Sequence, residues 1–201
     1  GAGNLLGAEQ HGHIASVGFE MYCQLLDEAV QKLRDGRPIP ETPEPVIDLA
    51  VEAYLDGGYI NDAMHKIEIY QRVAAVRSEE QITRLLDDLV DRFGEPTLPV
   101  RRLLDVARLK NSARALGVKS IVEKPGFIEI TLLEMHAVKP ERLIAEKERF
   151  GRNLQLLPAQ RLLRLKRLPR QGDVLTLLLQ FLRSLRGEAV EQSVLAEKET
   201  G

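Results

Sequence analysis

The sequence predicts an α+β fold: an N-terminal loop and long helix appended to a compact domain of about five helices packed on a small mixed or antiparallel sheet. In several stretches apolar residues recur at spacings of three and four, which is typical of one face of a helix. The segment KSIVEKPGFIEITLL (119–133) instead reads as two strands joined by a turn at 124–126. Glycines and prolines separate these patterns, so each is expected to form its own element.

The N-terminal part is predicted to be a loop and helix followed by a linker. Ser16 is a suitable N-cap for a helix over 16–35, and Gly36 ends it. The prolines of RPIPETPEP (37–45) favour a stiff linker. The expected segments are the loop and helix at 1–37, the linker at 38–45, the compact domain at 46–187 and a frayed tail at 188–201.

The compact domain is expected to begin with a strand and a capped helix. VIDLAVEAYL (46–55) alternates apolar and polar residues, which is the period of a strand. Asp62 can cap a helix over 63–76. The apolar face of this helix is expected to hold Met64, Ile67, Tyr70, Val73 and Ala74.

Two more helices are expected before the hairpin. Ser78 followed by Gln81 matches a capping box, which begins a helix that runs through Phe93. Pro99 suits the first turn of a third helix, over 99–116, because proline lacks the amide hydrogen that an interior position needs.

Short elements and a last helix complete the predicted domain. A short helix over 140–150 precedes two strand candidates, within 153–158 and 161–168. Asp173 can then cap a leucine-rich helix over 174–186. Together with the hairpin, these strands supply the small sheet.

Composition indicates an ordinary globular chain. Hydrophobic residues make up 44% of the 201 residues, which is enough for a core without disulfides, and Cys23 has no partner cysteine. No apolar run approaches the roughly 20 residues of a membrane span, so no membrane contact and a cytoplasmic location are expected. The net charge of −2 excludes a general attraction to nucleic acid.

No catalytic or metal constellation can be read from the residues. His11 and His13 could face the same way if the backbone were extended, but His65 and His136 are scattered. Cys23 is single, so a zinc site with about four ligands is not expected. The glycines of GAGNLLG (1–7) lack the lysine and hydroxyl residue of a phosphate-binding loop. The chain is therefore expected to have no enzymatic activity of its own.

One stretch is strongly basic. RLLRLKRLPR (161–170) holds five cations with no acid between them: Arg161, Arg164, Lys166, Arg167 and Arg170. In a strand, Leu163 and Leu165 would face inward and Arg164 and Lys166 outward. Such a strand can repel edge-to-edge association, contact a protein partner or bind phosphates. Binders of single-stranded nucleic acid add stacking aromatics, which this stretch lacks, so a protein-facing or solvated role is favoured.

Carboxylates are concentrated on the expected helix surfaces. Asp87 and Asp91 are expected to pair with Arg84 and Arg92, for a few tenths of a kcal/mol each. The acids on these faces are Glu79, Glu80, Asp87, Asp88, Asp91, Glu146 and Glu148.

The beginning of the chain resembles the last part of a translocation motif shared by RecG and the bacterial transcription-repair coupling factors (Mfd). In GAGNLLGAEQHGHIASVGFEMYCQLLDEAV (1–30), one set of matching positions is Gly1, Gly3, Leu5, Leu6, Gly7, Gln10 and Gly12. A second set is Ile14, Gly18, Phe19, Tyr22, Leu25, Leu26 and Ala29. RecG shares the glycine loop but not the helix after it.

The resemblance to the coupling factors continues through the compact domain, over about 1–187. Residues 53–96 and LLDVARLKNSARALGVKSI (103–121) are similar to their C-terminal domain. The resemblance therefore implies a C-terminal fragment of a coupling factor. In the family, the full-length protein is a double-stranded DNA translocase that uses ATP and Mg²⁺, displaces stalled RNA polymerase and recruits nucleotide excision repair through UvrA.

The resemblance also implies roles for parts of this chain. Gln10 matches a glutamine that couples ATP hydrolysis to DNA movement, in a tight loop with Gly1, Gly3, Gly7 and Gly12. The C-terminal domain of the family docks on an N-terminal UvrB-like module, which masks the UvrA-binding surface and restrains the motor. RNA polymerase and DNA contact upstream domains only.

Charge alone makes both the basic 161–170 stretch and the acidic helix faces candidates for the docking surface. The alternative function is an autonomous nucleic-acid-binding module that uses 161–170.

Overall fold

The computed structural model describes residues 43–167 and 173–188, which form five α-helices, five strands and short 3₁₀ turns. The strands are β1 (Val46–Asp48), β2 (Val118–Lys124), β3 (Phe127–Leu132), β4 (Leu154–Leu157) and β5 (Leu162–Lys166). The helices are α2 (Ala63–Ala75), α3 (Glu79–Phe93), α4 (Leu98–Leu116), α5 (Pro140–Phe150) and α6 (Val174–Arg186). The predicted α+β class is confirmed. The predicted helix over 16–35 lies outside the described residues.

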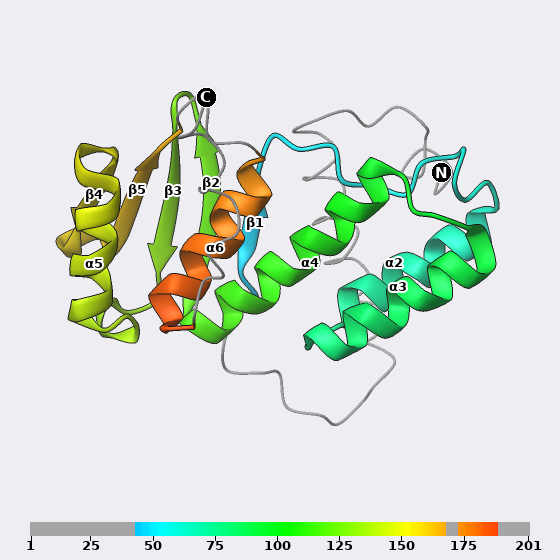
Figure 1. Cartoon of the computed structure of the whole chain (residues 1–201), viewed down its shortest axis with the longest axis horizontal. Coiled ribbons are helices and arrows are strands. Elements are labelled where there is room, and N and C mark those ends of the chain that lie inside the picture. The colour runs from blue at the N-terminus through cyan, green and yellow to red at the C-terminus, as the bar shows by residue number, and fades with distance from the viewer. Residues whose placement is uncertain (1–42, 168–172, 189–201) are drawn as a thin grey trace, which may run out of the picture.

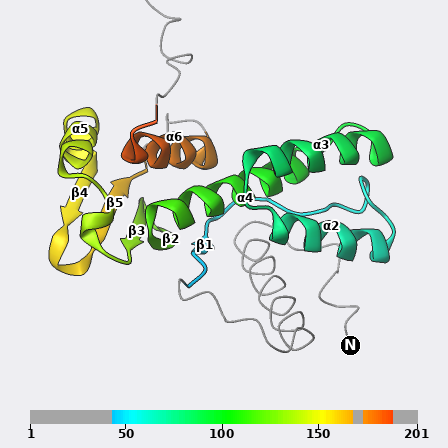
Figure 2. The ribbon, with the colours of Figure 1, turned by 90° about the horizontal axis from the view of Figure 1, so that it is seen from below.

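The five strands form one mixed sheet with the order β1-β2-β3-β5-β4. β1 pairs with β2 in parallel, and the other three pairings are antiparallel. Helices α4, α5 and α6 cover one face of the sheet, while α2 and α3 pack at the far end of the long helix α4 (Figure 1). Figure 2 shows the same division from below, with α4 joining the sheet end to the helical end.

The strand predicted over 46–55 is much shorter in the structure, where β1 ends at Asp48. The alternation itself holds, because every second residue from Ile47 to Leu55 is buried. The backbone nevertheless leaves the sheet and finds other partners. The Tyr54 amide donates to the Pro99 carbonyl at 3.2 Å, and the Leu55 amide donates to the Tyr70 hydroxyl at 2.9 Å. These bonds replace the sheet ladder, since buried amides must be satisfied.

The caps predicted for α2 and α3 are present. The Asp62 carboxylate accepts from the His65 amide at 2.9 Å at the start of α2. The Ser78 hydroxyl accepts from the Gln81 amide at 3.2 Å at the start of α3. The return bond of this capping box goes to Arg77, whose amide donates to the Gln81 side chain at 2.6 Å, one residue before the expected position.

The apolar face predicted for α2 is only partly correct. Met64 is 71% exposed, whereas Ile69, which was not assigned to the face, is fully buried. Val73 is buried as expected. The helix is therefore rotated so that its buried stripe runs through Ile69 and Val73, the residues that meet the core.

The expected hairpin and the C-terminal elements are also present. Lys124 pairs with Phe127, so the turn between β2 and β3 consists of Pro125 and Gly126. Gly126 has φ +82°, a conformation that glycine adopts readily and that larger residues rarely do. The two strand candidates form β4 and β5, and Asp173 caps α6 by accepting from the Leu175 amide at 3.3 Å.

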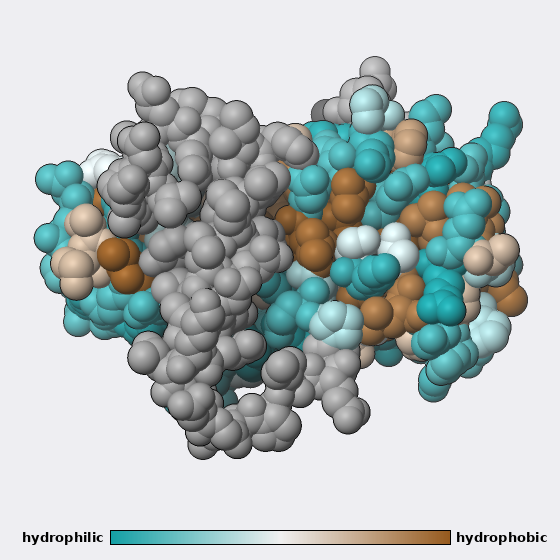
Figure 3. Space-filling view, turned by 180° about the vertical axis from the view of Figure 1, so that it is seen from behind, coloured by the Kyte–Doolittle hydropathy of each residue, from teal (hydrophilic) through white to brown (hydrophobic). Residues whose placement is uncertain are grey.

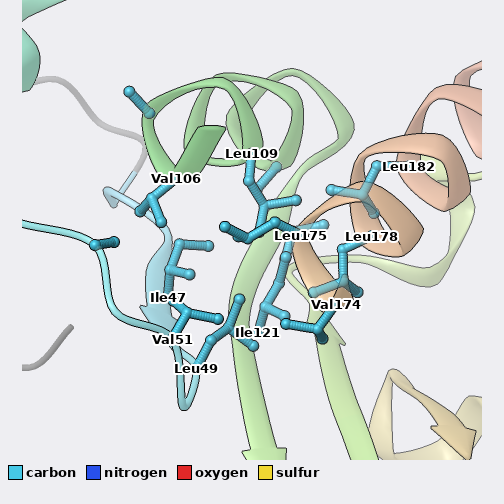
Figure 4. Packing of buried hydrophobic residues seen from close by; sticks show 14 of the residues in the cluster. Ile47, Leu49, Val51, Val106, Leu109, Ile121, Val174, Leu175, Leu178 and Leu182 are labelled. Carbon is cyan, nitrogen blue, oxygen red and sulfur yellow. The ribbon is translucent and has the colours of Figure 1, made fainter. Parts of the chain in front are cut away.

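The core lies between the sheet and the helices that cover it (Figure 4). Side chains from the β1 segment, from α4, from β2 and from α6 converge there. Among them, Leu49, Leu109, Ile121, Leu175 and Leu178 are fully buried. The sheet, α4 and α6 therefore stabilise one another through a shared apolar contact.

Glu44 connects the segment before β1 to α4 and to the loop between α2 and α3. Its carboxylate accepts from Arg114 at 2.5 Å and lies 3.8 Å from Arg77. Burial alone would raise the pKa of Glu44, but the hydrogen bond and the charge of Arg114, with Arg77 and Lys110, lower it below its ordinary value of 4.5.

We expect Glu44 to make stability depend on acid pH. Its folded-state pKa is lowered, so its contribution is present above about pH 4.5 and is lost as pH falls through the lowered value. Melting temperatures of the native protein and of Glu44→Gln, measured from pH 7 downward, should differ most near neutrality and converge in acid. A constant difference across this range would contradict the assignment.

Candidate partner-contact surface

Four of the five predicted basic residues lie in or beside β5, at the sheet end of the molecule. Arg170 lies outside the described residues. The same holds for the predicted coupling residues Gln10, Gly1, Gly3, Gly7 and Gly12, so their roles stay predictions.

β5 is not an edge strand, contrary to one of the expectations for the basic stretch. It lies between β3 and β4, with antiparallel pairing on both sides. The edge position belongs to β4, which follows α5 in the sequence and pairs with β5 only. Protection of a free edge therefore cannot explain the cations of β5.

The expected alternation along β5 is correct. Leu163 and Leu165 are fully buried on the helix-covered face, and Arg164 lies on the opposite face. The Arg164 guanidinium donates to Glu129 of β3 at 2.9 Å and lies 4.7 Å from the centre of the Phe127 ring. Cross-strand neighbours therefore neutralise and cover Arg164.

Arg161 and Arg167 are bound within the domain. Arg167 forms an ion pair with the largely buried Glu123, and its amide donates to the Gly126 carbonyl at 3.0 Å. Arg161 donates to the Leu133 carbonyl at 2.6 Å. Arg161 also adopts φ +52°, a left-handed conformation that side-chain-bearing residues rarely adopt. Both residues are therefore held in place by contacts that stabilise the fold.

Lys166 and Arg152 are cations of this region that make no ion pair within the described residues. Both are exposed, and they line a shallow hollow of about 190 Å³ together with Gly126, Phe127, Asn153, Gln155 and Arg164. Arg152 was missed by sequence reasoning because it lies far from 161–170 in the chain. Only the β4–β5 register, which pairs Leu154 with Leu165, brings it close.

The acidic face of α3 is paired differently from the prediction. Arg84 pairs with Glu80, and Arg92 pairs with Asp88 and, across to α2, with Glu68. Asp87 and Asp91 are exposed and make no ion pair within the described residues. Two unpaired carboxylates one helical turn apart therefore face solvent on α3.

The paired acids of α2 and α3 have perturbed pKa values. Hydrogen bonding from Arg92 lowers the pKa of Glu68, and hydrogen bonding from Arg72 lowers the pKa of Asp88. Arg92 donates to both Glu68 oxygens, at 2.9 and 3.1 Å. This network joins α2 to α3 and keeps both acids ionised at neutral pH.

Within residues 43–167 and 173–188, no cluster of histidine, cysteine or acidic side chains is arranged to hold a metal ion. None of the helices in that part of the chain is both long and apolar enough to span a membrane.

Comparison with known families gives a match to the TRCF domain over residues 49–143. Residues 49–143 belong to the TRCF domain family. The match begins just after β1 and ends within α5, so it contains α2, α3, α4 and the β2–β3 hairpin.

Proteins named transcription-repair-coupling factor are similar to a larger part of the chain. The protein of Staphylococcus epidermidis is 39% identical over 159 residues, which are 78% of this chain and 14% of that protein. The protein of Staphylococcus aureus is 43% identical over 133 residues, which are 66% of this chain and 11% of that protein. The chain thus spans about one seventh or less of the length of these relatives.

A solved structure has the same fold as the TRCF domain described here. It is the crystal structure of the C-terminal domain of a transcription-repair coupling factor, with a TM-score of 0.62 and 24% identity. The alignment covers 72% of this chain and 92% of that one. This likeness supports the fold assignment of the TRCF domain.

Proposed function

We propose that the TRCF domain of this chain is the regulatory C-terminal domain of an ATP-dependent DNA translocase that displaces stalled RNA polymerase and recruits nucleotide excision repair. In this proposal, the domain docks on an N-terminal UvrB-like module, masks its UvrA-binding surface and restrains the motor. Gln10 couples ATP hydrolysis to movement, and ATP and Mg²⁺ act in the motor regions of the full-length protein.

The observation that carries the proposal is the TRCF match at 49–143. It is supported by relatives such as the Staphylococcus epidermidis protein, of which the 159 aligned residues are only 14%. A domain with its own core, attached to a much longer protein, is suited to act by docking on another part of it. The likeness to a C-terminal domain of a coupling factor supports the same view.

Masking by a docked domain is an equilibrium between two states. A docked state about 2–3 kcal/mol more stable than the undocked one leaves a few per cent of molecules or fewer exposed. A contact that must open on engagement of a partner is expected to be polar and of modest area. Unpaired surface charges are therefore the side chains best suited to form it.

By this criterion, the acidic face of α3 is the better-supported docking surface. Asp87 and Asp91 are exposed and unpaired within the described residues. The described cations of 161–170 are mostly neutralised, since Arg161, Arg164 and Arg167 already pair with acids of the domain. The same internal ion pairs make the basic stretch a weaker candidate for the alternative function, nucleic-acid binding.

Deleting residues 46–187 from a full-length protein that carries this domain should raise its affinity for UvrA, since the masked surface becomes free. Deleting only residues 189–201 is the matched control and should leave the affinity unchanged. Titration calorimetry or surface plasmon resonance with purified UvrA measures both. Equal UvrA affinity of the intact protein and the domain deletion would contradict the proposal.

A further inference from the structure

The hollow beside β5 has a charge imbalance that the docking proposal does not use. We call it the sheet hollow and define it by its lining: Gly126, Phe127, Arg152, Asn153, Gln155, Arg164 and Lys166. Its volume is about 190 Å³. It lies at the sheet end of the molecule, where the view from behind shows apolar side chains between hydrophilic ones (Figure 3).

Three cations from two elements line the sheet hollow, and a carboxylate pairs with only one of them. Glu129 binds Arg164, whose Nε atom is buried and has no hydrogen-bond partner. Arg152 and Lys166 make no ion pair within the described residues. The site therefore holds two uncompensated positive charges in a chain whose net charge is −2.

A second hollow of the domain shows that such an imbalance is not general. It has a volume of about 450 Å³ and lies between α3 and α4. Its two arginines are paired: Arg101 lies 3.4 Å from Glu95, and Arg108 lies 2.8 Å from Glu79 and 2.9 Å from Asp105. Uncompensated cations thus distinguish the sheet hollow from the α3–α4 hollow.

We propose that the sheet hollow binds carboxylate side chains of an acidic segment of a partner protein. Arg152 and Lys166 supply charged donors for carboxylates, and the side-chain amides of Asn153 and Gln155 add neutral ones. The ring of Phe127, next to Arg164, gives the segment a small apolar contact.

Two observations favour an acidic protein segment over nucleic acid. Arg161 and Arg167, which would extend the cations into a track for successive phosphates, are paired with Glu134 and Glu123. The guanidinium of Arg164 covers one face of Phe127, which leaves less of this ring to stack on a base. The charge is therefore local, as suits one or two carboxylates.

The experiment uses the 201-residue chain and does not depend on the docking proposal. A fluorescent peptide of alternating glutamate and serine is the probe, with a DNA duplex of random sequence as the second probe, both at low and at physiological salt. Fluorescence anisotropy gives the affinities of the native chain, of Lys166→Glu and of Arg152→Glu. Lys139→Glu, an exposed lysine outside the hollow, makes the same charge change and is the control.

The acidic peptide should bind the native chain, and each hollow variant should weaken it by about tenfold, while Lys139→Glu leaves it within about twofold. Lys166→Arg should restore the native affinity. Equal loss in the control variant would show binding to net charge alone and overturn the proposal. Binding of the duplex more tightly than the peptide, with loss in the same two variants, would assign the hollow to phosphates instead. Failure of the peptide to bind would also overturn the proposal that the sheet hollow binds carboxylates. It would leave the docking proposal intact, because UvrA affinity of the domain deletion tests that proposal separately.

Discussion

Replacing Phe181 with alanine is expected to lower the free energy of unfolding by about 3–5 kcal/mol, the largest loss that a single truncation in this domain should cause. Phe181 is fully buried on α6. Its ring meets Phe150, the last residue of α5, edge to face with 5.6 Å between ring centres. The truncation therefore removes apolar burial, leaves a cavity and breaks an aromatic pair where α5 meets α6.

Urea unfolding of the 201-residue chain, followed by circular dichroism, measures this loss. Leu98→Ala is the matched control, because Leu98 is 57% exposed, and it should change stability by no more than about 0.5 kcal/mol. A loss below about 1 kcal/mol for Phe181→Ala would show that α6 does not pack into the core as described.

The helices were predictable because their signals are local. The side chains of Asp62 and Ser78 cap α2 and α3, and Gly117, with φ +70°, ends α4. Such signals depend on residues within one turn of the helix end, so they can be recognised without knowledge of the tertiary structure. The Pro125–Gly126 turn of the hairpin is another local signal of this kind.

Features set by contacts between distant segments were not predictable in the same way. The alternation at 46–55 correctly indicated burial, but residues after β1 bond to distant groups instead of a strand. The amides of Tyr54 and Leu55 donate to the Pro99 carbonyl and the Tyr70 hydroxyl. Similarly, β5 became an interior strand because β4, which precedes it in sequence, pairs on its outer side.

The free charge of the candidate site was also hard to predict from sequence, because ion pairs form between distant segments. The 161–170 stretch contains no acid, yet Arg164 meets Glu129 and Arg167 meets Glu123 across the sheet. Sequence proximity therefore overstated the free charge of this stretch. It also missed Arg152, which only the β4–β5 pairing places beside Lys166.

Reversing the two free acids of α3, as Asp87→Lys with Asp91→Lys in the full-length protein, is expected to raise UvrA affinity by about tenfold or more. The upper bound is the roughly 30- to 150-fold that corresponds to a docked state about 2–3 kcal/mol more stable than the open one. The physical reason is that both side chains are exposed and unpaired within the described residues, so reversal removes attraction to a basic partner surface without breaking an internal ion pair.

The competing surface supplies the matched test. Arg164→Glu with Lys166→Glu makes an equal number of charge reversals on the sheet and should leave UvrA affinity within about twofold. Circular dichroism of each variant checks that the fold is kept, which matters for Arg164 because it binds Glu129 at 2.9 Å. A rise in UvrA affinity with the sheet variant and none with the α3 variant would place the docking contact on the basic stretch. Because the two variants change charge in opposite directions, a rise in both would mean that neither surface acts through a specific contact. The docking contact would then lie elsewhere on the domain.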